Sequence, residues 1–234
     1  MSVVSQTVME RIIFIGANNP ETLRVMNAVR KDGSSVTFLG FIDNDPSKKG
    51  KMFLGLPVFG GYEVVKDLLA PDVRFVNLIT RDCVTRYETS KRIYDLGGEF
   101  TNFVHPSVNL ELVSMGVGNY IQENVVLQAG VSIGDNSSIH MGSLIGHEST
   151  IGNSTFVAHG CNVSGLVRIE DAVLVGTGAS IVPRVSIGRF SVIGAGTVII
   201  EDLPPYSVAV GNPGRVIRKV ESKYAAAGLT REPE

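Results

Sequence analysis

The chain has 234 residues, a formal net charge of −2 and a pI of about 6.1, so it offers no basic surface for nucleic acid. No run approaches the roughly 18 apolar residues of a membrane span, and the N-terminus lacks the basic start and apolar core of a signal peptide. Cys83 and Cys161 form no CxxC pair and are expected to be reduced thiols. Together these features predict a cytoplasmic protein.

The first hundred residues alternate between strand-like and helix-like patterns. The apolar run at 11–16 predicts a buried strand, and Pro20 with Glu21 opens a helical pattern. The further strands are expected at 36–43, 73–79 and 100–104, and the further helices at 62–69 and 84–96. This alternation predicts a small Rossmann-like α/β domain with a parallel sheet over residues 1–106.

Polar residues follow three of these strands. Ligands of parallel sheets bind beyond the carboxyl ends of the strands. The residues expected around one crevice are therefore Gly16, Ala17, Asn18 and Asn19, then Asp43 and Asn44, then Thr80 and Arg81. GxGxxG spacing is absent after Gly16, which argues against an NAD enzyme. A tight turn and helix cap without any ligand is the alternative.

An aliphatic residue recurs at every sixth position from Ile121 to Ile199. The fourteen positions are Ile121, Leu127, Ile133, Ile139, Ile145, Ile151, Val157, Val163, Ile169, Val175, Ile181, Ile187, Ile193 and Ile199. A period of six fits neither a helix nor a simple strand, and it is the period of a hexapeptide β-helix.

Each six-residue unit is predicted to form one short strand and one corner, with the aliphatic side chain pointing into a narrow prism. Asn136 and Asn153 fall at corners, where asparagine tolerates left-handed backbone angles. One unit cannot bury its own apolar face, so stability comes from stacking. The prism is expected over residues 107–220, followed by a C-terminal tail over 221–234 that is expected to be loosely ordered from Ala225 to Glu234.

The order of these parts resembles the NeuD/PglD family of sugar acetyltransferases. The resemblance rests on the small α/β domain, the hexapeptide repeat, the closing VAVGNPGR segment at 208–215, and the IGHESTIG segment at 145–152. It implies a left-handed parallel β-helix, acetyl-CoA as cosubstrate, an amino sugar carried on a nucleotide as acceptor, a homotrimer, and a role in polysaccharide biosynthesis.

The resemblance makes His147 and Glu148 the catalytic pair. An amine or hydroxyl sheds a proton as it attacks a thioester, and histidine, with an ordinary pKa of about 6.5, can accept that proton. Glu148 could orient the ring and stabilise the imidazolium, although sequence adjacency alone does not establish contact. The alternative is an ordinary surface histidine beside a surface glutamate.

The resemblance also implies binding residues. Gly165 would offer a backbone N–H to the acetyl carbonyl, Thr177 and Ala195 would follow the pantetheine arm, and Arg215 with Lys219 would meet the phosphates of coenzyme A. Phe156 stands where some members have a second histidine near the acetyl group. His140 stands near the expected acceptor, where asparagine is frequent, and His159 is an additional histidine. The coenzyme would lie between adjacent prisms, so a monomer would lack a complete site.

Two other functions stay open. His140, His147 and His159 could ligate zinc across a trimer interface, as in γ-class carbonic anhydrases, although the N-terminal domain is foreign to that class and no metal is expected here. His159 should lie nearly beneath His140, with His147 on another corner. The second alternative is a non-catalytic scaffold. Within the enzyme hypothesis, N-acetylation is favoured by analogy and O-acetylation remains possible.

Overall fold

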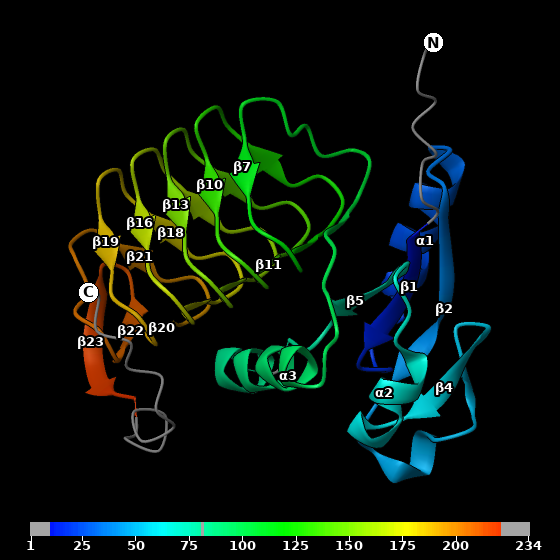
Figure 1. Cartoon of the computed structure of the whole chain (residues 1–234). Coiled ribbons are helices and arrows are strands. Elements are labelled where there is room, and N and C mark those ends of the chain that lie inside the picture. The colour runs from blue at the N-terminus through cyan, green and yellow to red at the C-terminus, as the bar shows by residue number, and fades with distance from the viewer. Residues whose placement is uncertain (1–9, 81, 221–234) are drawn as a thin grey trace.

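The structure, a computed structural model, describes residues 10–80 and 82–220. A small α/β part stands beside a long prism of stacked coils, and helix α3 runs alongside the prism (Figure 1). The helices of the α/β part are α1 (Thr22–Lys31), η1 (Pro46–Lys48), η2 (Tyr62–Val64), α2 (Val65–Leu68) and α3 (Cys83–Asp95). None of the helices in the described ranges has the length and hydrophobicity that a membrane span needs.

The α/β part is built on a five-stranded sheet in the order β3-β4-β2-β1-β5. Its strands are β1 (Glu10–Ile15), β2 (Val36–Ile42), β3 (Met52–Phe53), β4 (Leu56–Gly60) and β5 (Val73–Asn77). The four strands β4, β2, β1 and β5 are parallel, as the sequence predicts for a Rossmann-like domain, and β1 is buried between β2 and β5. The antiparallel β3–β4 hairpin was not predicted.

Two elements differ from their expected form. The helix expected at 62–69 begins as the 3₁₀ turn η2 and continues as the short helix α2. The strand expected at 100–104 is divided: Phe100 bridges to Phe75 in the first sheet, whereas β6 (Phe103–Val104) pairs with the prism. The chain therefore passes from one sheet to the other within this segment, and the domain boundary at 106 stays a prediction.

The prism is the predicted left-handed parallel β-helix, with three faces. Face one consists of β7 (Ser114–Met115), β10 (Ser132–Ile133), β13 (Thr150–Ile151), β16 (Arg168–Ile169) and β19 (Ser186–Ile187). Face two consists of β6, β8 (Tyr120–Ile121), β11 (Ser138–Ile139), β14 (Phe156–Val157), β17 (Leu174–Val175), β20 (Val192–Ile193), β22 (Ser207–Gly211) and β23 (Gly214–Lys219). Face three consists of β9 (Val126–Leu127), β12 (Leu144–Ile145), β15 (Asn162–Val163), β18 (Ser180–Ile181) and β21 (Val198–Ile199).

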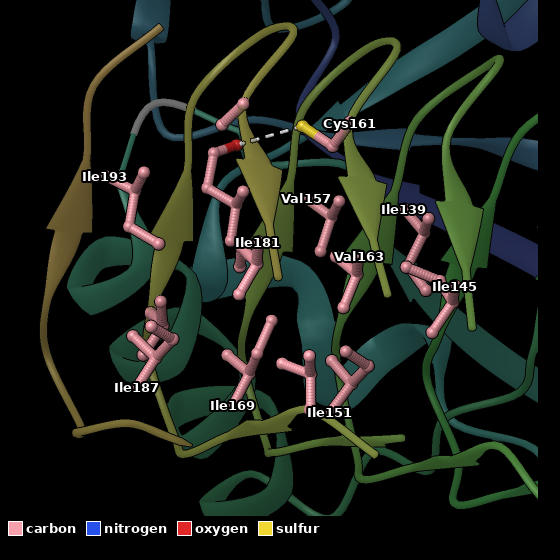
Figure 2. Close-up of a cluster of buried hydrophobic side chains, with 14 of the residues drawn as sticks. Ile139, Ile145, Ile151, Val157, Cys161, Val163, Ile169, Ile181, Ile187 and Ile193 are labelled. Atoms are coloured by element: carbon pink, nitrogen blue, oxygen red, sulfur yellow. Dashed lines mark hydrogen bonds between the residues drawn. The ribbon is translucent and has the colours of Figure 1, made fainter. Parts of the chain in front are cut away.

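The repeated aliphatic residues fill the prism. All fourteen are at most 7% exposed, and Figure 2 shows those of successive coils stacked inside the three faces. Small polar residues complete the interior: the hydroxyl of Ser137 donates to the Gly152 carbonyl oxygen at 2.7 Å, and that of Ser143 donates in the same way to Ala158 at 2.7 Å. The thiol of Cys161 contacts the Val175 carbonyl oxygen at 3.8 Å (Figure 2).

A left-handed residue occupies the corners at intervals of six. Asn136 has a left-handed φ of 54°, as expected. At the next predicted corner the left-handed residue is Ser154, with φ 52°, and not its neighbour Asn153. The side chain of Asn153 instead links two coils, because its Oδ1 accepts a hydrogen bond from the backbone N–H of Asp135 at 2.8 Å. Glu148 occupies one of the left-handed positions, with φ 56°. For a residue with a side chain this conformation costs about 1 kcal/mol or more.

Arg86 of α3 joins the two parts. Its fully buried guanidinium donates to the carbonyl oxygens of Asn77 and Ile79 in the first domain. It also donates to those of Asn136 and Ser137 at a corner of the prism. Burial lowers the pKa of Arg86 to about 10, so the group stays charged at neutral pH. These four contacts fix the carboxyl end of β5 against the prism.

Candidate functional site

His147 lies just past β12, on the corner between faces three and one. The backbone N–H of His147 donates to Gln128 Oε1 at 2.8 Å, and its carbonyl oxygen accepts from Leu166 at 2.8 Å. Both contacts come from neighbouring coils, so the backbone is held from above and below. The left-handed turn at Glu148 follows immediately. The chain path therefore presents two adjacent side chains at one corner.

The imidazole and the carboxylate of this corner are in contact. His147 Nδ1 lies 3.3 Å from Glu148 Oε1, and the two side chains are 56% and 67% exposed. The side chains of His147 and Glu148 are therefore in contact, which their adjacency in the sequence did not establish. With Nδ1 facing the carboxylate, Nε2 is the ring nitrogen available to a substrate.

The imidazole reaches over the next coil at Gly165. A Cβ built there would lie 2.4 Å from His147 Nε2, so only glycine leaves room for the ring. The backbone N–H of Gly165 makes no hydrogen bond to any described residue. A base nitrogen and a free N–H donor are therefore neighbours, as acyl transfer requires.

A cavity of about 220 Å³ opens beside this corner, on face three. Gln128, Gly146 and Gly165 line it toward His147, and Val126 and Leu144 form its apolar wall. These two aliphatic side chains are 48% and 45% exposed although they are paired across β9 and β12. The exposed apolar wall makes face three suited to contact with a ligand or with another protein surface.

The other predicted histidines lie at the opposite edge of face three. His140 is 3% exposed; its ring centroid lies 4.7 Å from that of Phe156 and 4.8 Å from that of His159. His159, Thr177 and Ala195 are exposed on successive coils of this corner. The predicted stacking of His159 beneath His140 is confirmed. Thr177 and Ala195 are thus separated from His147 by the width of face three, and Phe156 lies on face two beside His140.

Burial controls the state of His140. Desolvation, with the neighbouring His159 and Arg86, lowers the pKa of His140 to about 3, so the ring is neutral. Its Nδ1 lies 3.4 Å from His159 Nε2, and its buried Nε2 has no partner in the described part of the chain. Within that part, no three His, Cys, Asp or Glu side chains are arranged to hold a metal ion.

Arg215 and Lys219 lie on β23 at the far end of the prism. Arg215 is exposed and pairs with Glu201 at 3.5 Å. The ammonium of Lys219 donates to Ser207 Oγ at 3.2 Å and to the Pro205 carbonyl oxygen at 3.3 Å. Both cations are accessible, and their role toward coenzyme A stays a prediction.

A second cavity of about 140 Å³ lies at the carboxyl ends of β1 and β2. It is lined by Ile15, Gly16, Asn18, Ile42, Asp43, Asn44, Tyr62 and Ile79. The predicted Gly16, Asn18, Asp43 and Asn44 therefore meet in one crevice. Ala17 is buried behind it and donates its backbone N–H to Asp43 Oδ2 at 2.9 Å.

The remaining predicted crevice residues are placed differently. Asn19 Oδ1 accepts the N–H of Glu21 at 3.0 Å, at the start of α1, and does not line the cavity. Thr80 is half-buried next to the lining residue Ile79. Arg81 lies outside the described residues. His140 lies in the prism, away from the crevice lining, so its acceptor contact stays a prediction.

Asp43 is the electrostatic centre of the crevice. Burial raises its pKa, but hydrogen bonds from Lys48, Ala17 and Asp45 outweigh that effect and lower the pKa below its usual range. Lys48 Nζ lies 2.7 Å from Asp43 Oδ2 and also donates to Asn18 Oδ1. The carboxylate is therefore ionised and held in place.

Sequence reasoning missed Gln128, Lys48, Tyr62 and Arg86. The position of Gln128, 19 residues before His147, is one coil below it and could have been found from the repeat. Lys48 lies five residues after Asp43, and no pattern in the sequence marked it as a residue of the crevice. Arg86 lies in a helix whose orientation only the packing decides.

No protein-family model matches the sequence. The fold is similar to the crystal structure of PerB from Caulobacter crescentus in complex with CoA and GDP-perosamine, with a TM-score of 0.78 and 27% identity over 90% of this chain and 98% of that one. A mutant of the GDP-perosamine N-acetyl transferase of the same bacterium, with the same two ligands, has a TM-score of 0.62 and 26% identity over the same shares.

A "putative acetyltransferase" of Staphylococcus aureus is 40% identical over 73 residues, which are 31% of this chain and 37% of that protein. The matches thus span only about a third of the curated relatives' length. These similarities confirm the predicted resemblance to acetyltransferases built from a small α/β domain and a β-helix.

Proposed function

We propose that the protein is a homotrimeric acetyltransferase of the cytoplasm that transfers the acetyl group of acetyl-CoA to the amine of a nucleotide-linked sugar. The observation that carries the proposal is the His147–Glu148 contact above Gly165, beside an open cavity. The similarity to an N-acetyltransferase that binds CoA and a nucleotide sugar supports the substrate class.

His147 acts as general base in this proposal. The amine attacks the thioester carbonyl and forms the amide C–N bond, and its proton passes to His147 Nε2. The C–S bond breaks, and the thiolate of coenzyme A takes the proton back from the imidazolium. The carboxylate of Glu148 stabilises the positive ring, and the free N–H of Gly165 stabilises the oxyanion.

The positions of these residues on the two edges of face three support the proposed assembly. His147 and Gly165 lie on one edge, whereas Thr177 and Ala195 lie on the other, next to Phe156 on face two. If two copies meet across face three, the catalytic corner of one approaches the coenzyme-binding corner of the next. The exposed Val126 and Leu144 are suited to this contact. A cyclic trimer would form three equivalent composite sites.

The activity is tested by thiol release from acetyl-CoA in the presence of nucleotide-linked sugars. Matched acceptors with an amine or a hydroxyl at the same carbon separate N- from O-acetylation. We expect release with an amino sugar that persists after treatment with a metal chelator. Failure of every amino sugar, or loss of activity with the chelator and its return with zinc, would contradict the proposal.

The composite site is tested by mixing two inactive variants. His147→Ala removes the base, and Ala195→Trp blocks the opposite corner. After unfolding and refolding together in equal amounts, about a quarter of the composite sites carry both intact corners. Activity should return to that fraction of wild type. No recovery in mixed trimers would show that each site is formed by a single chain.

A further inference from the structure

Gln122 and Gln128 support the prism in the same way at two different corners. Gln128 Oε1 accepts the backbone N–H of His147 at 2.8 Å, and Gln122 Oε1 accepts that of Met141 at 3.1 Å. In both pairs the supported residue follows the glutamine by 19 positions, one coil further along the prism. A backbone N–H can only donate, so the accepting atom of each amide is its oxygen. The structural role of these glutamines therefore uses Oε1.

The amide nitrogens of the two glutamines differ. Gln122 is 1% exposed, and its Nε2 donates to the hydroxyl oxygen of Tyr120 at 3.1 Å. Gln128 is exposed, and its Nε2 makes no hydrogen bond to any residue in the described ranges 10–80 and 82–220. Gln128 also lines the cavity of about 220 Å³ beside His147. The wall of this cavity therefore carries a hydrogen-bond donor that the fold itself does not use.

The cavity wall next to Gln128 is apolar. Val126 and Leu144 are 48% and 45% exposed on face three, which is the face proposed to meet a second copy. When that copy covers the face, water is displaced from the amide, and enclosed donors in proteins normally have an acceptor. The acceptor for Gln128 Nε2 must then belong to the second copy or to a bound substrate.

The position of Gln128 along the prism favours the sugar over the coenzyme. Gln128 follows β9, on the coil whose strand β8 pairs with β6, next to the α/β domain. Thr177 and Ala195, which are expected to follow the pantetheine arm, lie on later coils, on the other side of His147. A sugar held by the α/β domain would therefore approach His147 from the side of Gln128.

The chemistry of the transfer restricts which atom of the sugar can meet Gln128. The lone pair of the reacting amine attacks the thioester and its proton goes to His147, so the amine is not available as an acceptor. A sugar carries hydroxyl oxygens on carbons beside the amine, and these oxygens have lone pairs. Successive coils are stacked about 4.8 Å apart, a spacing that one sugar ring can bridge.

We propose that Gln128 determines the specificity for the acceptor: its Nε2 donates a hydrogen bond to a hydroxyl oxygen beside the amine of the sugar. The sugar ring is then held at two points, by His147 at the amine and by Gln128 at the neighbouring hydroxyl. Gln128 takes no part in proton transfer, and it discriminates against amino sugars that lack this hydroxyl. The inference rests on the proposed acetyltransferase function and deepens it.

The test compares acceptors that differ by one hydroxyl. Steady-state thiol release is measured with the most active nucleotide-linked amino sugar and with its analogues that each lack one hydroxyl beside the amine. In the wild type we expect one analogue to lower kcat/KM at least about tenfold, because it leaves the donor of Gln128 without its partner. Equal kcat/KM for the parent sugar and every analogue would overturn the inference.

Gln128→Glu and Gln128→Met assign the discrimination to the amide nitrogen. Gln128→Glu keeps an oxygen for the backbone N–H of His147, whereas Gln128→Met loses both polar atoms. Both variants should bring the ratio of kcat/KM for the parent sugar and the analogue close to one. Each ratio is measured within one variant, so it does not depend on the folded fraction. Lower turnover with an unchanged ratio would show that Gln128 only supports the His147 backbone, and would refute the inference.

Asn162→Leu is the matched control. Asn162 lines the same cavity from β15, one coil beyond His147, and its exposed amide lies toward the coils expected to bind the coenzyme. The ratio should stay at its wild-type value in this variant. Loss of the ratio in Asn162→Leu as well would contradict the assignment to Gln128.

The two proposals fail in different ways. Acetyl transfer to an amino sugar without discrimination among the deoxy analogues would refute the role of Gln128 and leave the acetyltransferase function intact. No transfer by the wild type to any amino sugar would refute the proposed function, and the inference on Gln128 with it.

Discussion

His147 and Gly165 are matched across two coils of the prism. The imidazole occupies the space that a Cβ at 165 would take, 2.4 Å from Nε2. Glu148 holds the other ring nitrogen at 3.3 Å. The orientation of the ring is therefore set by a carboxylate on one side and by the absence of a side chain on the other.

Gly165→Ala should displace the His147 ring and lower turnover on the order of 10²-fold, because misplacing a reacting group by about 1 Å has an effect of that size. Steady-state kinetics of thiol release measure the change. In a His147→Ala background the same substitution should have little further effect. Additive losses in the double variant would show that Gly165 acts independently of the ring.

His147→Ala should lower turnover by about 10²-fold or more, because a positioned general base contributes 10² to 10⁴. The oligomeric state and the thermal midpoint should stay unchanged, since the side chain is 56% exposed. His105→Ala is the control, because His105 follows β6, contacts Ser107 Oγ at 2.8 Å through Nδ1 and does not line the cavity beside His147. Turnover close to wild type in His147→Ala would show that His147 is not the general base.

Arg86→Met should destabilise the protein by about 3 to 5 kcal/mol, because it leaves buried carbonyl oxygens of both domains without donors. Urea unfolding measures the loss. Arg92→Met, an exposed position on the same helix, should change stability little. If the two variants are equally stable, the buried guanidinium does not hold the domains together.

His140 should make stability depend on pH. Its folded pKa of about 3 lies below the ordinary value of 6.5, so the unfolded chain binds the extra proton between these values. Its stabilising contribution is present above about pH 6.5 and is lost as pH falls toward 3. Between pH 7 and 5 this loss amounts to about 2 kcal/mol.

Urea midpoints of wild type and His140→Gln at pH 7 and pH 5 check this dependence. The variant should lose less stability than wild type over that interval. A wild-type slope that His140→Gln leaves intact would contradict a buried neutral ring.

The sequence by itself determined the architecture. A period of six fixes one inward residue for each strand and corner, so the burial of Ile121 through Ile199 followed from the repeat. Strand ends placed Gly16, Asn18, Asp43 and Asn44 at one crevice because parallel strands share a carboxyl edge. In both cases the regular geometry of strands and turns converts a position in the sequence into a position in the fold.

Only the tertiary structure decided the contacts that depend on neighbouring coils or on domain packing. The space that Gly165 leaves for the His147 ring and the Lys48 contact that orients Asn18 both join residues through space. Side-chain direction and packing set these relationships, and no local period encodes them.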